Sequence, residues 1–415
     1  MRHLPADDPE VAALVRQEAS RLSGTIDLIA SESLPPASVM EAQGSVFTVK
    51  TVEGYPGRRF HAGCAVADEL ERLGVERARR LFGAGHANLQ PHTGVSANLA
   101  VYFSVLEVGD RVLAMELSHG GHLSHGHRSS ITGRCFRFAH YHVSRDTERI
   151  DYDEIEHLAW RFQPRMIVAG SSTYTRLIDY RRIARIAEAV SAYVLTDMAH
   201  IAGLVAAGVI PSPVPHSDFV TFTTYKTMGG GRGGVILCRA EHAEAVDRAV
   251  FPGCQGTPFM NLLAAKAVCL GLAGGPGFAE TQRRTLQNAA RLASEMERRG
   301  YRLVHGGTEN HIVLLDLRPK GLTGAAAERT LESVGILTNR NAIPYDPERP
   351  QVASGLRLGT AAVAARGLGP DEMGDLARLM DRALTGRDDP GVLRAVAAEV
   401  SGLCTRFPTP AFGEA

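Results

Sequence analysis

The stretch FVTFTTYKTMGGGRGGVILC (residues 219–238) contains the pattern that decides the fold. Two continuous apolar runs, FVTFTTY (219–225) and GVILC (234–238), flank a glycine-rich turn that begins directly after Lys226. Similar runs occur outward along the chain: RVLAMEL (111–117), RMIVAG (165–170) and AYVLTDM (192–198). Continuous rather than alternating apolar residues are typical of strands buried on both faces. We therefore predict an α/β fold with a mainly parallel sheet and helices on both sides.

The segments on either side of this sheet predict two further parts. Residues 8–23 have helical spacing and precede a segment rich in proline and glycine, so residues 1–79 are predicted to form an N-terminal arm and loop. Residues 80–276 carry the sheet. The glycine-rich stretch from Gly271 to Gly277 marks a boundary, and the pattern after it predicts a smaller α+β domain over residues 277–415. Its expected elements are a charged helix (280–299), strands (301–304 and 311–317) and two further helices (324–334 and 371–385).

The composition narrows the class of protein. In 415 residues, 45 Lys and Arg balance 45 Asp and Glu, so there is no net positive charge to hold a nucleic acid or an anionic membrane surface. No run of about 18 apolar residues is present and the N-terminus lacks a signal-peptide pattern, which predicts a cytoplasmic location. The six cysteines lie far apart with no Cys-x-x-Cys pair, which favours buried free thiols over disulfides or a zinc knuckle.

Polar residues that follow the apolar runs are the first candidates for a site, because ligands of open α/β sheets collect at the carboxyl ends of strands. Asp197 ends the run YVLTD, and His200 follows in DMAH. A buried carboxylate is costly unless it meets a positive partner, such as a protonated ring nitrogen. Lys226 could form a Schiff base, because desolvation lowers the pKa of its amine. Taken singly, Asp197 also fits a helix cap and Lys226 an exposed loop lysine.

The segment LQPHTGVSANLAVYF (89–103) places Thr93 and Ser96 at the start of an apolar helix. Free backbone N–H groups there, together with the two hydroxyls, could bind a phosphate. The alternative is an ordinary helix cap. Arg357, in GLRLGT, could clamp a carboxylate with two parallel hydrogen bonds, or form a surface ion pair.

The segment SHGGHLSHGH (118–127) contains four histidines: His119, His122, His125 and His127. A zinc site is one interpretation. We expect no metal, because the glycines indicate a loop, no cysteine or acidic cluster accompanies the histidines, and imidazoles also stack on aromatic cofactors. A lysine for an imine, an aspartate for a ring nitrogen, a phosphate site, a stacking histidine and a carboxylate-binding arginine together predict a pyridoxal phosphate enzyme acting on an amino acid.

At this point the sequence resembles the serine hydroxymethyltransferase family across nearly its whole length. The matching segments are LIASES, VEGYPGRR, LSHGGHLSHG, TDMAHIAGLVAAG, TTYKTMGGGRGG, AVFPGCQGTP, GLTG, NAIPYDP, SGLRLGT and LCTRFP. The resemblance implies a fold-type I transferase (aspartate aminotransferase-like) with a seven-stranded sheet, pyridoxal 5'-phosphate as cofactor and tetrahydrofolate as cosubstrate. It also implies a homodimer whose active sites borrow residues from the partner, with a tetramer left open.

The resemblance also implies roles for individual residues. Lys226 resembles the Schiff-base lysine, Asp197 the partner of the pyridine nitrogen, and His122 the ring-stacking histidine. The other positions around the cofactor are Thr51, Thr93, Gly94, Val95, Ser96, Ser172, His200, Thr223 and Thr257. Glu53 matches the acid/base residue for hydroxymethyl transfer, and Arg357 the substrate-carboxylate ligand, helped by Ser31. The substrate and folate positions are Tyr55, Leu117, Gly121, Leu123, Phe251 and Asn341, and Arg58 lies in the loop beside Glu53.

Several departures from the family pattern share this pocket. The family usually has tyrosine at Thr51, two tyrosines at Phe60 and His61, serine at Thr93 and Val95, histidine at Tyr225 and glycine at Thr257. Thr51 in place of tyrosine leaves room for a methyl group instead of the substrate α-hydrogen, since a buried methyl needs little space and gains about 0.8 kcal/mol. His61, with an ordinary pKa near 6.5, could serve as a proton relay.

This pattern resembles the 2-methylserine hydroxymethyltransferase branch, which interconverts 2-methyl-L-serine and D-alanine with tetrahydrofolate. Ordinary serine/glycine hydroxymethyl transfer is the first alternative, because the folate positions are kept. A folate-independent aldolase of β-hydroxy amino acids or a threonine transaldolase is the second, favoured by the losses at Phe60 and His61. A catalytically silent binding protein is the third, and it is disfavoured because Lys226, Asp197 and Arg357 are all present.

Overall fold

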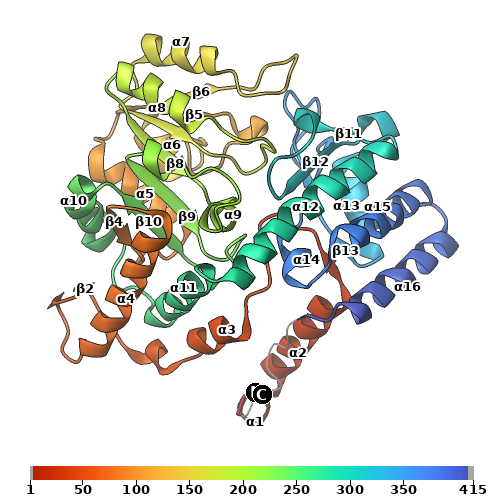
Figure 1. The fold of residues 1–415 in the computed structure, drawn as a ribbon, viewed down its shortest axis with the longest axis horizontal. Coiled ribbons are helices and arrows are strands. Elements are labelled where there is room, and N and C mark those ends of the chain that lie inside the picture. Colours follow the sequence, from red (N-terminus) through yellow and green to blue (C-terminus); the bar gives the residue numbers. More distant parts are fainter. Residues whose placement is uncertain (1–2, 410–415) are drawn as a thin grey trace.

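The apolar runs form the centre of a twisted sheet in the computed structural model, which describes residues 3–409 (Figure 1). The few residues of the two predicted outer parts that lie beyond this range, 1–2 and 410–415, are outside the described residues. In the described chain this sheet has seven strands, and only β10 runs antiparallel to its neighbours. In spatial order the strands are β4 (His86–Asn88), β10 (Gly234–Cys238), β9 (Phe219–Thr223), β8 (Tyr193–Asp197), β7 (Met166–Ala169), β5 (Arg111–Met115) and β6 (Arg137–Tyr141). The prediction of an α/β fold with a mainly parallel sheet is confirmed.

Helices cover both faces of this sheet, which explains why its strands are continuously apolar. Along β5, Val112 and Ala114 belong to a core cluster with α5 (Gly94–Val105) and α10 (Ala243–Arg248), whereas Leu113 and Met115 face the cluster with α7 (Tyr152–Phe162) and α8 (Tyr180–Ala189). A third cluster packs α4 (Ala65–Phe82), α9 (Ala202–Ala206) and α11 (Met260–Ala273) on β9 and β10. The edge strand β6 was not among the predicted runs, because most of its residues are only partly buried and it lacks an apolar run.

A second, smaller sheet forms the C-terminal part, in the spatial order β11 (Arg302–Leu303), β12 (Ile312–Asp316), β15 (Gly355–Gly359) and β14 (Asn339–Asn341), with antiparallel pairing throughout. It packs with α12 (Pro276–Arg298), α13 (Gly324–Ser333), α14 (Ala361–Ala365), α15 (Pro370–Thr385) and α16 (Pro390–Arg406). In Figure 1 the long helix α12 runs from the large sheet to the small one. The expected α+β elements are therefore present, and the domain boundaries at 79 and 276 remain a prediction.

The N-terminal segment packs with the C-terminal part. After α1 (Leu4–Asp7) and α2 (Pro9–Gly24), strand β1 (Ile26–Asp27) pairs in parallel with β13 (Ile336–Leu337). Ile26 and Leu28 are fully buried in the C-terminal core. The chain then returns to the large sheet through α3 (Ala37–Gln43), a short 3-10 turn η1 (Val46–Val49) and the hairpin of β2 (Gly54–Tyr55) and β3 (Arg58–Arg59). The N-terminal residues thereby connect the two sheets before α4 begins.

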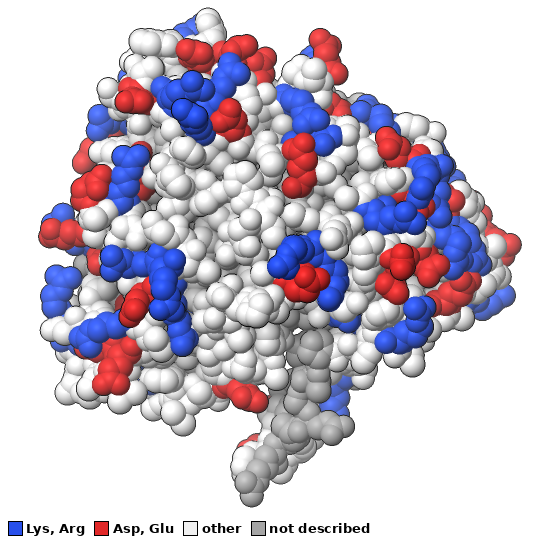
Figure 2. Space-filling view, viewed as in Figure 1, with Lys and Arg blue, Asp and Glu red and all other residues white. Residues whose placement is uncertain are grey.

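Charge and hydropathy of the described chain agree with the composition. Lys, Arg, Asp and Glu are interspersed on the face shown in Figure 2, and the middle of that face is mostly uncharged. Within residues 3–409 no single helix is long and apolar enough to cross a membrane, and only α11 and α12 taken together, bent by 83°, reach that length and composition. All six cysteines lie in this range and are free thiols.

Candidate active site

A cavity opens where β8 and β9 end and where helix α5 begins, which is the edge of the sheet predicted from the sequence. Its lining comes from five separate stretches of chain: Thr93, Gly94, Val95, Asn98, His122, His125, Gly170, Ser171, Ser172, Asp197, Ala199, His200, Thr223, Tyr225 and Lys226. Nine of the predicted site residues are in this list, which leaves out Arg357 and the hairpin residues around Glu53. The cavity therefore gathers residues more than 130 positions apart in the sequence.

Lys226 follows β9 and is buried, with 7% of its surface exposed. Burial lowers the pKa of its amine to about 8, with a further lowering from the positive charge of Arg357 and an opposing effect of the Asp197 carboxylate. A substantial fraction of the amine is therefore neutral near pH 7, and a neutral amine can attack a carbonyl carbon.

Asp197 at the end of β8 is held as an anion. Its Oδ2 accepts a hydrogen bond from Asn98 Nδ2 at 2.9 Å and lies 3.2 Å from His125 Nε2, while its Oδ1 accepts from the Ala199 amide at 3.0 Å. Burial alone would raise the pKa of Asp197, but the hydrogen bond and charge of His125 outweigh it and hold the pKa well below its usual range. Tyr102 Oη fixes His125 from behind, 2.8 Å from Nδ1. A buried anion of this kind can partner a protonated ring nitrogen.

His122 lies on the same cavity wall and is uncharged. Burial lowers the pKa of its imidazole to about 4, so the ring is neutral over the physiological range. Its Nδ1 is 2.7 Å from Ser124 Oγ, which fixes the plane of the ring. A neutral, oriented imidazole can stack on a flat aromatic ligand.

Part of the zinc site considered from the sequence is present in the structure, as a group of two histidines and one aspartate. Ligand atoms of His122, His125 and Asp197 lie within 4.8 Å of one another, which is close enough for a metal ion. Of the four histidines in the motif, only these two take part, because His119 packs against the rings of Tyr345 and His142. The Asp197 carboxylate is already bonded to Asn98 and His125. This donor set fits an aspartate held for an organic cation better than a closed tetrahedral zinc site.

The start of helix α5 also lines the cavity, through Thr93, Gly94 and Val95. Thr93 is the N-cap residue, and its hydroxyl and that of Ser96 form a reciprocal capping box with the backbone N–H groups of both residues. The two hydroxyls and the N–H groups of Thr93 and Ser96 are thus used by the cap itself, whereas the N–H groups of Gly94 and Val95 in the first turn have no partner in the described chain. Val95, the second residue of this helix, is apolar and 46% exposed. This helix start can bind an anion mainly through its backbone and dipole.

Arg357 extends from β15 of the small sheet toward the cavity, although it does not line it. Its Nε donates to Asn339 Oδ1 at 3.0 Å, and one terminal nitrogen donates to the Ser172 carbonyl oxygen at 2.9 Å. Burial lowers the pKa of the guanidinium to about 10, so it stays charged near neutral pH. Ser31 is half-buried in the loop after β1, next to Ala30, whose carbonyl oxygen lies 3.1 Å from Nε2 of the buried His311. The arginine joins the two parts of the protein at the site.

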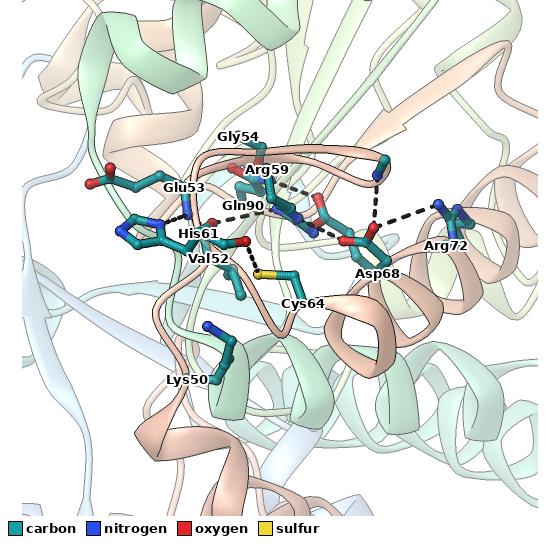
Figure 3. A network of polar contacts seen from close by, with 12 residues as sticks. Lys50, Val52, Glu53, Gly54, Arg59, His61, Cys64, Asp68, Arg72 and Gln90 are labelled. Atoms are coloured by element: carbon teal, nitrogen blue, oxygen red, sulfur yellow. Dashed lines mark hydrogen bonds and ion pairs between the residues drawn. The ribbon is translucent and has the colours of Figure 1, made fainter.

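Glu53 and His61 lie on a separate structure, the hairpin of β2 and β3 with the loop after it (Figure 3). The buried Arg59 anchors this hairpin to α4, through Asp68 at 2.7 Å and Glu71 at 2.5 Å, and it donates to the Gly54 carbonyl oxygen at 2.6 Å. In Figure 3 the Glu53 carboxylate points away from this ion-pair network. The hairpin therefore holds the backbone of Glu53 rigidly and leaves its carboxylate unpaired with Arg59.

The remaining predicted residues of this region also have defined places. His61 is exposed, and its Nδ1 accepts from the Glu53 amide at 3.5 Å, so the predicted relay lies beside the predicted acid/base group. Thr257 Oγ1 accepts from the Val52 amide at 3.1 Å, next to the exposed Thr51. Tyr55 Oη donates to the Asp247 carbonyl oxygen at 2.6 Å and thus faces the interior. Within the described chain none of these residues lines the cavity at Lys226.

The predicted folate positions lie on several separate elements, and within the described chain none of them lines the cavity at Lys226. Gly121 is buried, and a Cβ atom there would lie 2.3 Å from the Met115 carbonyl oxygen, so only glycine fits. Leu117 and Leu123 are 40% and 52% exposed on either side of it. Asn341 ends β14, and Phe251 lies 5.7 Å from the Phe60 ring, centroid to centroid.

Six residues that line the cavity were not predicted as site residues, and two of them, Asn98 and His125, hold the Asp197 carboxylate. Asn98 links Asp197 to Thr221, and His125 links Asp197 to Tyr102. The sequence did contain signals: a buried asparagine within the apolar helix VSANLAVYF, and a second histidine three residues after His122. Neither signal identifies its partner, because Asn98 and Asp197 are 99 positions apart.

A comparison with protein families matches residues 4–380 to the serine hydroxymethyltransferase family. The chain belongs to the serine hydroxymethyltransferase family. Members of the family are pyridoxal phosphate-dependent one-carbon transferases with tetrahydrofolate as cosubstrate, and the chain is therefore such an enzyme. The family has the fold-type I architecture that the resemblance implied, and its reaction is hydroxymethyl transfer involving an amino acid.

The residues present fit this cofactor. Within the described chain, Thr223 Oγ1 and His200 Nδ1 are buried polar atoms without a hydrogen-bond partner, and both residues line the cavity. Unpaired buried polar atoms are costly unless a ligand satisfies them. The neutral fraction of Lys226, the anionic Asp197 and the helix start at Thr93 supply the three kinds of group that an aldehyde, a pyridine nitrogen and a phosphate require.

Proposed function

We propose that this member of the family is a 2-methylserine hydroxymethyltransferase, which interconverts 2-methyl-L-serine and D-alanine with tetrahydrofolate and 5,10-methylenetetrahydrofolate. The observation that carries the proposal is Thr51, which stands where the family usually has tyrosine. Thr51 is exposed at the end of the rigid hairpin segment, and the adjoining Val52 amide is bonded to Thr257. Because Thr51 does not line the cavity of its own chain, we propose that it faces the site of a partner subunit, where a threonine frees the volume of an aromatic ring for the α-methyl group of the substrate.

The geometry described above supports the following roles for the residues of the site. Bound pyridoxal phosphate supplies an electron sink for the Cα bond that lies perpendicular to its ring. Lys226 would hold the carbonyl carbon of the cofactor, Asp197 its protonated pyridine nitrogen, and the backbone at Thr93 to Ser96 its phosphate. His122 would orient the ring by stacking. Thr223 Oγ1 and His200 Nδ1, which lack partners in the described chain, would bond to the polar atoms of the cofactor.

Arg357 binds the substrate carboxylate with the N–H groups that Asn339 and Ser172 leave free. Glu53 handles the proton at the transferred hydroxymethyl oxygen, with His61 as a relay. Glu53 and His61 lie on the hairpin, outside the cavity of their own chain, so we propose that they act in the site of a partner subunit. The exposed apolar side chains Val46, Val49 and Phe60 around this hairpin, 76% to 85% exposed, favour a homodimer. Light scattering of the purified protein measures that assembly, and cell fractionation tests the expected cytoplasmic location.

The deciding experiment compares one-carbon transfer to tetrahydrofolate from 2-methyl-L-serine and from L-serine, with a control without folate. We expect faster transfer from 2-methylserine, and we expect Thr51→Tyr to reverse the preference by about 10- to 200-fold, the usual worth of one methyl-sized difference in a pocket. Thr385→Tyr is the matched control, because this threonine is exposed at the end of α15, and it should leave the preference unchanged.

The other outcomes distinguish the alternatives. Equal or faster transfer from L-serine by the unaltered enzyme would identify ordinary serine/glycine hydroxymethyl transfer. The exposed Leu117 and Leu123 beside Gly121 are compatible with either reaction, because their predicted role is to contact folate, which both reactions use, and not the amino acid. Cleavage of β-hydroxy amino acids at full rate without folate would identify an aldolase or a transaldolase.

A further inference from the structure

Lys266 is a buried lysine outside the cavity, midway along α11. Burial lowers the pKa of its amine to about 7, but three carbonyl oxygens within hydrogen-bond distance favour the protonated ammonium, since only that form has three N–H donors. Only 3% of its surface is exposed. Its ammonium donates three hydrogen bonds to backbone carbonyl oxygens, to Leu89 at 2.7 Å, Pro91 at 2.9 Å and Gly234 at 2.9 Å. An ammonium has three N–H donors, so this set is complete. A buried charge is tolerated only when it is paired or fully hydrogen-bonded, and here three carbonyl dipoles satisfy it.

These three carbonyl groups lie where strands β4 and β10 stop pairing. The pairing of β4 with β10 ends at Asn88 and Ile236. Beyond it, the Gly234 amide donates to the Pro91 carbonyl oxygen at 3.1 Å, and the chain turns through His92 into the N-cap of α5. Pro91 thus already accepts one backbone hydrogen bond, and the ammonium supplies a further donor to it and a donor to the Leu89 and Gly234 carbonyl groups, where the ladder of β4 and β10 has ended.

Close packing around the ammonium restricts the backbone at the end of the glycine-rich turn. A Cβ atom at Gly233 would lie 2.0 Å from Lys266 Cε, and one at Gly234 would lie 2.2 Å from the Thr93 carbonyl oxygen. A Cβ atom at Gly94 would lie 2.7 Å from Thr223 Cγ2. Gly233 and Gly234 therefore allow the Lys266 side chain and the start of α5 to approach the sheet closely. A shift of the Lys266 side chain would thus also shift the start of α5.

We infer that Lys266 is a positioning residue for the cofactor phosphate, because its ammonium fixes the backbone of residues 89–91 and thereby the N–H groups at the start of α5. This inference rests on the proposed phosphate site at Thr93 to Ser96. Lys266 does not touch the cofactor; it sets the place of the groups that do. The side chains at this helix start contribute little to the phosphate, since Thr93 and Ser96 bond to each other and Val95 is apolar. The position of the backbone N–H groups therefore matters more for phosphate binding in this site than it would in a site where free side-chain hydroxyls bind the anion.

The test separates the phosphate from the rest of the cofactor. Apoprotein of Lys266→Met is titrated with pyridoxal 5'-phosphate and with pyridoxal, which lacks the phosphate, and bound ligand is followed by absorbance. We expect the dissociation constant of pyridoxal phosphate to rise by about tenfold or more, while that of pyridoxal changes little. Leu270→Ala is the matched control on the same helix, since Leu270 is buried in the core beneath α11 and should not change the ratio of the two constants.

Equal losses for both ligands, or no loss for either, would refute the inference. Val95→Asp tests the underlying phosphate site separately, because a negative charge at the helix start should weaken pyridoxal phosphate and spare pyridoxal. If Val95→Asp leaves the ratio unchanged, the phosphate site is wrong; if it changes the ratio and Lys266→Met does not, only the role of Lys266 is wrong. Should Lys266→Met not fold, Lys266→Gln keeps an amide donor and is expected to give a smaller change in the same ratio.

Discussion

Raising the pH is expected to accelerate the capture of pyridoxal phosphate by the apoprotein, because only the neutral amine of Lys226 attacks a carbonyl. Burial, assisted by the charge of Arg357, lowers the pKa of Lys226 from 10.5 to about 8. At pH 7 about one-tenth of the amine is then neutral, against about 0.03% for an ordinary lysine, a difference of about 300-fold. The neutral fraction reaches about one half at pH 8 and about nine-tenths at pH 9, and it is nearly constant above that.

The assay is stopped-flow absorbance of apoprotein mixed with pyridoxal phosphate across this pH range. The same reaction with a free lysine derivative serves as the reference, so that ionisation of the cofactor itself cancels. The ratio of the two rates is expected to be largest near neutral pH and to fall as the free lysine loses its proton. Arg357→Met removes a positive charge and should move the midpoint of the protein reaction upward. A midpoint close to 10.5 in the unaltered protein would refute the reasoning that burial activates Lys226.

Three further predictions concern the site and its supports. Glu53→Gln should abolish folate-dependent transfer and leave pyridoxal phosphate affinity unchanged; intact turnover would mean that Glu53 is not the acid/base group. His125→Ala removes a charged hydrogen bond from Asp197, so cofactor affinity measured by titration should fall by about 10- to 100-fold, and an unchanged affinity would show that Asn98 alone holds the carboxylate. Gly234→Ala places a Cβ atom against a backbone oxygen and should lower the free energy of unfolding, measured in urea, by about 1–3 kcal/mol. Gly277→Ala is the control, because the space around Gly277 is open, and it should be neutral or stabilising. Equal effects of the two substitutions would contradict the packing argument.

The large sheet could be predicted from local pattern because its central strands are buried on both faces, and residues on both faces of such a strand are therefore mostly apolar. The runs at 111–117, 165–170, 192–198, 219–225 and 234–238 each contain a strand. Strand β6 lies at the edge of the sheet and its residues are mostly half-buried, so its sequence RFAHY shows no such run. The pairing of β1 with β13 was also unpredictable, since a two-residue strand has no pattern and its partner lies about 310 positions away.

The candidate site also has a part that could be predicted from the sequence and a part that could not. Lys226, Asp197 and Thr93 could be singled out because each follows or precedes a recognisable element, and the family could be named from contiguous motifs. The sequence by itself therefore determined the fold class, the kind of chemistry and the cofactor, since these depend on the order of apolar runs and on residues within short segments. Tertiary structure alone decided that Asn98 and His125 hold Asp197, that Lys266 closes the gap between β4 and β10, and that Glu53 lies on an anchored hairpin outside its own cavity. These are contacts between distant segments, and their geometry depends on how helices and strands pack, which no local pattern encodes.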